Sequence, residues 1–114
     1  MILWLDEKVP CRFPHYAHHY VGVGGAMVNE KYQIMLIKEN RSLDARKWKL
    51  PGGFMDPKES LREAVEREVR EETGVVAKFE AVCAMREQSD YKYDQASDFY
   101  FVAVCTPLET SGEI

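Results

Sequence analysis

The fold of this chain is decided by residues 53–75, which read GFMDPKESLREAVEREVREETGV. In this stretch Ser60 stands three positions before Glu63, which is the spacing of a capping box at a helix start. Gly74 stands where a glycine commonly ends a helix. Apolar residues recur between them at the helical spacing, at Leu61, Ala64, Val65 and Val69. The sequence therefore predicts one helix from about Ser60 to Thr73 with a single apolar side.

The segments before the helix favour strands. Tyr20–Val28 is rich in β-forming residues but contains three glycines, which indicates a bulge or a close backbone approach. Asn29-Glu30-Lys31 predicts a turn, Tyr32–Lys38 a second strand, and Glu39–Arg46 a polar loop. Pro51-Gly52-Gly53 predicts a stop in front of the helix.

The segments after the helix favour strands as well. Val75–Arg86 and Phe99–Cys105 are the candidates, and the polar loop Glu87–Ala96 separates them. Strands on both sides of a single helix predict a mixed α/β (α+β) fold. With 114 residues, 46% of them hydrophobic, the chain is long enough for one compact domain and too short for two.

Charge and composition limit the partners. The net charge of −4 lacks the basic excess of a general nucleic-acid binder, so a small substrate is expected. No apolar run reaches the roughly 20 residues that span a bilayer, and the first residues lack the pattern of a signal peptide. We therefore expect a cytoplasmic protein without a membrane partner, with the mitochondrion and the nucleus as alternatives. Three scattered cysteines without a CxxC spacing predict reduced thiols.

Three carboxylates lie on one side of the predicted helix. Glu68, Glu71 and Glu72 occupy positions i, i+3 and i+4, so their side chains can converge on one point. Like charges at this spacing repel by roughly 0.2–0.5 kcal/mol per pair, and acids near a helix C-terminus oppose its dipole. Helical spacing gives Glu68 and Glu72 no basic partner. A counter-charge from elsewhere is therefore predicted.

Two interpretations of this acidic side remain open on local physics. Composition alone favours a solvated acidic surface. The other is a cation site, because clustered hard oxygens suit Mg²⁺ or Mn²⁺, and such an ion can neutralise phosphate oxygens and lower the pKa of an attacking water.

The spacing around the acids resembles a known family. Gly53, five residues, Glu59, seven residues and then residues 67–75, REVREETGV, match every fixed position of the box that defines the Nudix hydrolases. The flanking strand order is similar from about Tyr20 to the end. The resemblance implies a Nudix-type α/β/α sandwich with a mixed β-sheet and a loop-helix-loop catalytic motif.

The same resemblance implies roles for individual residues. Gly53 would make a tight loop. Glu68 would orient or deprotonate the attacking water. Arg67 would hold the acids by a salt bridge, and Glu59 would be a structural or outer-shell acid. The implied ligands of Mg²⁺ or Mn²⁺ are Glu68, Glu71, Glu72 and the backbone carbonyl of Gly52.

Residues outside the box bear on the substrate. Tyr16–Ala26, Trp48–Gly53 and Ser97–Tyr100 are similar to Nudix proteins related to the antisense basic fibroblast growth factor protein and to ADP-ribose and NADH diphosphatases. This implies hydrolysis of the pyrophosphate bond in a nucleoside diphosphate linked to another moiety. Tyr91 and Tyr93 fall near the tyrosine of diadenosine-polyphosphate hydrolases, an alternative substrate class. A binding or regulatory module without turnover is the second alternative.

The resemblance also implies a domain organisation. Residues 1–19 would be an N-terminal arm or the remnant of an upstream domain. Residues 20–114 would be a Nudix domain that lacks its C-terminal strand and helix. Because the third layer would then be missing, we expect exposed apolar surface and a homodimer as one way to cover it.

Overall fold

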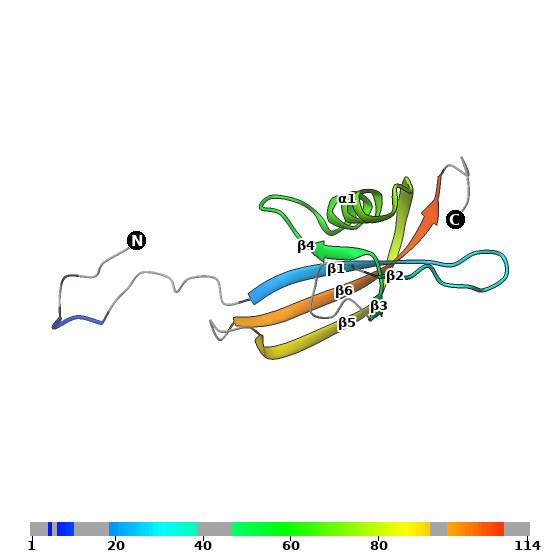
Figure 1. The fold of residues 1–114 in the computed structure, drawn as a ribbon. Coiled ribbons are helices and arrows are strands. Elements are labelled where there is room, and N and C mark those ends of the chain that lie inside the picture. Colours follow the sequence, from blue (N-terminus) through cyan, green and yellow to red (C-terminus); the bar gives the residue numbers. More distant parts are fainter. Residues whose placement is uncertain (1–4, 6, 11–18, 39–46, 92–95, 109–114) are drawn as a thin grey trace.

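The computed structural model describes residues 5, 7–10, 19–38, 47–91 and 96–108, although not the side chains of residues 90, 91 and 96. A four-stranded sheet and a two-stranded sheet accompany one helix within these ranges (Figure 1). The larger sheet consists of β1 (His19–Met27), β4 (Gly52–Phe54), β5 (Ala77–Tyr91) and β6 (Ala96–Pro107). The smaller sheet pairs β2 (Ile37–Lys38) with β3 (Trp48–Lys49), and the helix is α1 (Leu61–Thr73).

The larger sheet is mixed, as predicted. Its strand order is β4-β1-β6-β5, with β1 parallel to β6 and the other two pairs antiparallel. β1 therefore lies in the interior of the sheet, which explains its run of buried residues from Gly22 to Met27. β4 is an edge strand, and its outer backbone groups need partners from outside the sheet.

The helix begins and ends where the sequence predicted. The side chain of Ser60 accepts a hydrogen bond from the backbone N–H of Glu63 at 3.1 Å, which satisfies one amide of the first turn. Gly74 adopts the left-handed conformation with φ 76°, and its N–H donates to the carbonyl of Arg70. Both ends are thus set by local sequence.

The core forms where α1 covers one face of the larger sheet (Figure 1). Val65 and Val69 of α1 pack there with Val23, Met27 and Ala103 of the sheet. A Cβ atom at Gly25 would lie 2.5 Å from the Cγ2 atom of Val69, so the glycine allows the helix to approach β1. The close backbone approach predicted for Tyr20–Val28 is confirmed.

Three predicted boundaries are wrong. Only Ile37–Lys38 of the predicted strand Tyr32–Lys38 joins a strand, because the side chain of Asn29 binds the N–H groups of Lys31 and Gln33 in a turn. The predicted stop at Gly52-Gly53 is part of β4, so Gly53 lies in a strand and not in a tight loop. Pairing with β1 overrides the tendency of glycine to break strands.

The third wrong boundary is the loop predicted at Glu87–Ala96. Its first five residues continue β5, and β6 begins at Ala96. Cross-strand pairs such as Gln88 with Asp98 stabilise polar residues that would favour a loop in isolation. The predicted loop Glu39–Arg46 lies outside the described residues.

Candidate active site

The acidic side of α1 lies against the free edge of β4. Glu72 accepts a hydrogen bond from the backbone N–H of Gly52 at 3.1 Å, and the Nη2 atom of Arg67 donates to the carbonyl of Phe54 at 3.1 Å. In β4 the backbone of Gly53 pairs with Val23 of β1. Because backbone groups alternate in direction along a strand, those of Gly52 and Phe54 point away from β1. The helix therefore satisfies outward-facing groups of the edge strand with two of its charged side chains.

Arg67 is the centre of the cluster. Its Nε and Nη2 atoms donate to the two oxygens of Glu59 at 2.6 and 2.9 Å, in the bidentate geometry of a strong ion pair. Its Nη1 atom donates to Glu68 at 2.9 Å and to Glu71 at 3.2 Å. One guanidinium thus donates hydrogen bonds to three carboxylates, and its Nε atom lies 3.5 Å from a fourth, that of Asp56.

These contacts change the acidity of the groups involved. The hydrogen bonds from Arg67, followed by the one from the backbone N–H of Asp56, lower the pKa of Glu59 to about 2. The hydrogen bond to Glu59 is the main factor that raises the pKa of Arg67. Glu59 and Arg67 therefore form a permanently charged pair across the neutral pH range.

Gly53 allows Glu68 to take up its position. A Cβ atom on Gly53 would lie 2.6 Å from the Oε1 atom of Glu68, closer than side chains tolerate. The Glu68 side chain is only 13% exposed. The identity of Gly53 is therefore explained by the carboxylate packed against it.

The structure brings most of the predicted site residues together. The contacts above join Gly52, Gly53, Glu59, Arg67, Glu68, Glu71 and Glu72 in one cluster at the edge of the sheet. The side chain of Tyr91 and the whole of Tyr93 lie outside the described part of the structure. The resemblance implied a salt bridge from Arg67 to the acids, and Arg67 contacts Glu68 and Glu71. Helical spacing alone does not predict the contact with Glu68, because neighbours at i and i+1 do not face each other on an ideal helix surface.

The acids fit a divalent cation by their chemistry. In this conformation the counter-charge of Glu68 and Glu71 is Arg67, and no three Asp, Glu, His or Cys side chains among the described residues are grouped to hold an ion as they stand. Hard carboxylate oxygens on one helix side are nevertheless the donors that Mg²⁺ and Mn²⁺ prefer. Glu71 is 59% exposed, so it can turn toward Glu68 without disturbing the core.

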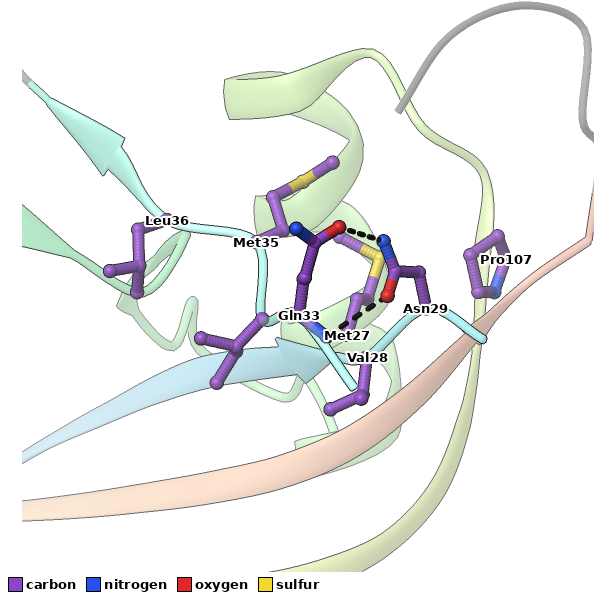
Figure 2. A pocket seen from close by; sticks show the side chains of 8 residues that line it. Met27, Val28, Asn29, Gln33, Met35, Leu36 and Pro107 are labelled. Carbon is purple, nitrogen blue, oxygen red and sulfur yellow. Dashed lines mark hydrogen bonds between the residues drawn. The ribbon is translucent and has the colours of Figure 1, made fainter. Parts of the chain in front are cut away.

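Two cavities lie near the helix and the turn. One of about 570 Å³ is lined in part by Arg67, Arg70, Glu71 and Leu108, so it adjoins the acidic cluster. The other, of about 470 Å³, is lined by Met27, Asn29, Gln33, Met35 and Pro107 among others (Figure 2). Its lining includes no acidic or basic side chain, and its two amide groups bind each other at 2.8 Å. The cavity beside the acids is therefore the better candidate for a charged substrate.

Comparison with known proteins identifies the family. The model of the NUDIX domain matches residues 18–113 of the chain. This chain belongs to the Nudix family. Members of this family hydrolyse pyrophosphate bonds in small nucleotide-linked substrates, generally with divalent metal ions.

Individual relatives agree with the Nudix assignment. The human protein named nucleoside diphosphate-linked moiety X motif 6 is 41% identical over 77% of this chain and 28% of its own length. A UDP-X diphosphatase structure superposes with a TM-score of 0.71 at 27% identity, over 89% of this chain and 48% of that one. An ADP-ribose pyrophosphatase from Streptococcus suis gives a TM-score of 0.62 at 26% identity, over 83% and 65% of the two chains. The Nudix chain thus spans less than a third of its human relative.

No helix in the described ranges of this Nudix chain has the length and apolar character needed to cross a bilayer.

Proposed function

We propose that this Nudix chain catalyses divalent-metal-dependent hydrolysis of the pyrophosphate bond in a nucleoside diphosphate linked to another moiety, of the ADP-ribose or NADH type. The observation that carries the proposal is the cluster of Glu68, Glu71 and Glu72, which Arg67 and the edge strand β4 hold together. The three carboxylates repel one another on the helix, so their arrangement costs stability. A costly arrangement of this kind favours a chemical role over that of a solvated surface.

Glu68, Glu71, Glu72 and the carbonyl of Gly52 would hold Mg²⁺ or Mn²⁺. When bound, the ion supplies charge neutralisation for the phosphate oxygens and acidifies water. Glu68, fixed by Arg67 and by its contact with Gly53, orients the water and accepts its proton. The water oxygen forms a bond to one phosphorus while the bridging oxygen leaves with the other phosphate. No covalent link to the protein is needed.

Arg67 and Glu59 have a positioning role in this scheme. The bidentate pair fixes the guanidinium, and the guanidinium keeps Glu68 and Glu71 close together despite their repulsion. Glu59 itself contacts Arg67 and the backbone N–H of Asp56, so it acts through Arg67.

The substrate class draws support from two similar structures. One is named for UDP-X and the other for ADP-ribose, and both substrates contain a nucleoside diphosphate. The alternative substrates, diadenosine polyphosphates, rest on Tyr91 and Tyr93 alone. We infer a small nucleotide-like partner from the family and from the net charge. We infer a cytoplasmic location from the composition of the sequence.

The test is a chromatographic assay for nucleoside monophosphate. The 114-residue chain is incubated with ADP-ribose, NADH, FAD, diadenosine polyphosphates and oxidised nucleoside triphosphates, with Mg²⁺, with Mn²⁺ and with a chelator. We expect AMP and ribose 5-phosphate from ADP-ribose only when the metal is present. Absence of metal-stimulated product from every substrate would contradict the proposal and favour the alternative of a binding or regulatory module.

A further inference from the structure

Arg67 has more acidic neighbours than it can bind through hydrogen bonds. A guanidinium carries five N–H groups. In Arg67 these groups donate to Glu59 twice, to Glu68, to Glu71 and to the carbonyl of Phe54. Each donor therefore has one acceptor, yet the Oδ2 atom of Asp56 also lies 3.5 Å from Nε. Asp56 is thus an additional carboxylate beside a guanidinium whose hydrogen bonds are complete.

A tight turn fixes the backbone of Asp56 in this place. Its carbonyl accepts a hydrogen bond from the N–H of Glu59 at 3.2 Å, and its own N–H donates to the Glu59 carboxylate at 2.9 Å. Pro57 and Lys58 are the central residues of the turn, and Lys58 has φ 65°, the left-handed conformation that a type II turn requires there. The side chain of Asp56 is nevertheless 66% exposed. It can therefore turn toward Arg67 while its backbone stays in place.

Arg67 competes with the proposed cation for Glu71. The Nη1 atom of Arg67 lies 2.9 Å from Glu68 and 3.2 Å from Glu71, and both acids are proposed metal ligands. A divalent cation held by these two carboxylates would lie close to the guanidinium, and like charges repel strongly at short distance. Glu71 is the partner that can leave, because it has the longer bond and an exposed side chain, whereas Glu68 is largely buried. Cation binding therefore costs the contact between Arg67 and Glu71.

We propose that Asp56 is a positioning residue for cation binding, because it neutralises Arg67 when Glu71 turns from Arg67 to the cation. The positive charge of a guanidinium is delocalised over its three nitrogens, so an acid at Nε can compensate for one lost at Nη1. This inference rests on the proposed function, in which Glu71 is a metal ligand. Asp56 acts through Arg67 and needs no contact with the cation or the substrate.

The experiment measures Mn²⁺ binding in the absence of substrate. Dissociation constants are determined by calorimetry for the wild-type 114-residue chain and for Asp56→Asn and Asp56→Glu. In Asp56→Asn the guanidinium holds Glu71 more firmly, so Mn²⁺ should bind roughly two- to fivefold more weakly, the range expected for one exposed ion pair. Asp56→Glu keeps the negative charge and should restore most of the wild-type affinity.

A double-mutant cycle decides whether Asp56 acts through Arg67 or attracts the cation directly. If Asp56 acts through the guanidinium, Asp56→Asn has no further effect on Mn²⁺ affinity in an Arg67→Gln background. A direct attraction gives the same loss in both backgrounds. Where Arg67→Gln does not fold, the ¹⁵N NMR signal of the Arg67 Nε atom is followed during a Mg²⁺ titration. It should shift in the wild type and shift much less in Asp56→Asn.

Glu63→Gln is the matched control. Glu63 stands one helical turn before Arg67 but forms no ion pair with it, so this variant removes an acid of the same helix without changing the contacts of the guanidinium. Its Mn²⁺ affinity should equal that of the wild type. Thermal unfolding without metal checks that each variant is folded, and Asp56→Asn should keep the wild-type midpoint because the side chain is exposed.

Three results would overturn the proposal: no Mn²⁺ binding by the wild type, equal dissociation constants for the wild type and Asp56→Asn, or an equal loss in the Arg67→Gln background. Because the titration involves no hydrolysis, its failure is distinguishable from that of the proposed function. A chain that binds Mn²⁺ with the help of Asp56 but cleaves no diphosphate contradicts only the proposed function. Metal-stimulated hydrolysis together with unchanged Mn²⁺ affinity in Asp56→Asn contradicts only the role of Asp56.

Discussion

The apolar and acidic sides of α1 are stabilised in different ways. Ala64, Val65 and Val69 are almost completely buried against the sheet, and apolar burial of this kind needs no specific partner atoms. Glu68 and Glu71 repel each other and depend on hydrogen bonds from one arginine. The apolar side therefore fixes the helix on the sheet, while the acidic side is an arrangement of directed hydrogen bonds that works against the repulsion between its carboxylates.

The largest effect is expected on the apolar side. Val69→Asp should unfold the domain, because an unpaired buried carboxylate costs several kcal/mol against a total stability of roughly 5–15 kcal/mol. Circular dichroism and thermal unfolding measure this. Val76→Asp is the control, since Val76 is 39% exposed and should tolerate the charge. A folded Val69→Asp protein would mean that α1 faces the sheet with another side.

On the acidic side we expect loss of activity without loss of fold. Glu71→Gln should lower turnover about a hundredfold or more, because it removes a proposed metal ligand, and stabilisation of the transition state by the metal is worth several kcal/mol. The melting temperature should hold, since Glu71 is 59% exposed. Glu63→Gln changes an exposed acid at the start of the same helix and should leave turnover unchanged. Near-normal turnover in Glu71→Gln would remove Glu71 from the ligand set.

Two neighbouring glycines sharpen the comparison. A Cβ at Gly52 would collide with the backbone carbonyl of Val23, so Gly52→Ala should destabilise the domain by roughly 1–3 kcal/mol. A Cβ at Gly53 would meet only the Glu68 carboxylate, which can move, so Gly53→Ala should mainly lower turnover, by about tenfold. Denaturant unfolding and steady-state kinetics on both variants measure the two effects. Equal stability of the two variants would contradict the assigned contacts.

The smallest effect concerns pH. The folded pKa of Glu59 is about 2, below its ordinary value of 4.5, so the pair with Arg67 stabilises the fold above pH 4.5. That contribution is lost as the pH falls from about 4.5 to about 2. Urea unfolding at pH 5 and pH 3 should show a steeper loss for the wild type than for Glu59→Gln. Parallel loss in both proteins would show that other carboxylates dominate acid unfolding.

Predictions from the sequence succeeded where the cause is local. Ser60, Gly74 and the apolar spacing predicted α1 correctly, because caps and helical periodicity act within a few residues. The same helical periodicity predicted that Glu68, Glu71 and Glu72 lie on one side of the helix. Helical periodicity could not predict that Arg67 contacts Glu59, eight residues earlier. Glu59 lies before the helix, and only the turn of the chain there brings it to Arg67.

The sequence by itself determined the helix, the mixed order of strands and the family, since these follow from spacing along the chain. Only the tertiary structure decided that Gly52 and Gly53 form an edge strand, because their pairing partners in β1 are about thirty residues away. It also decided which aromatic rings share a face: Tyr20, Phe54 and Tyr100 are distant in sequence and come together across three strands. Such contacts depend on strand register, and register is set by the collective burial of the sheet and not by any one segment.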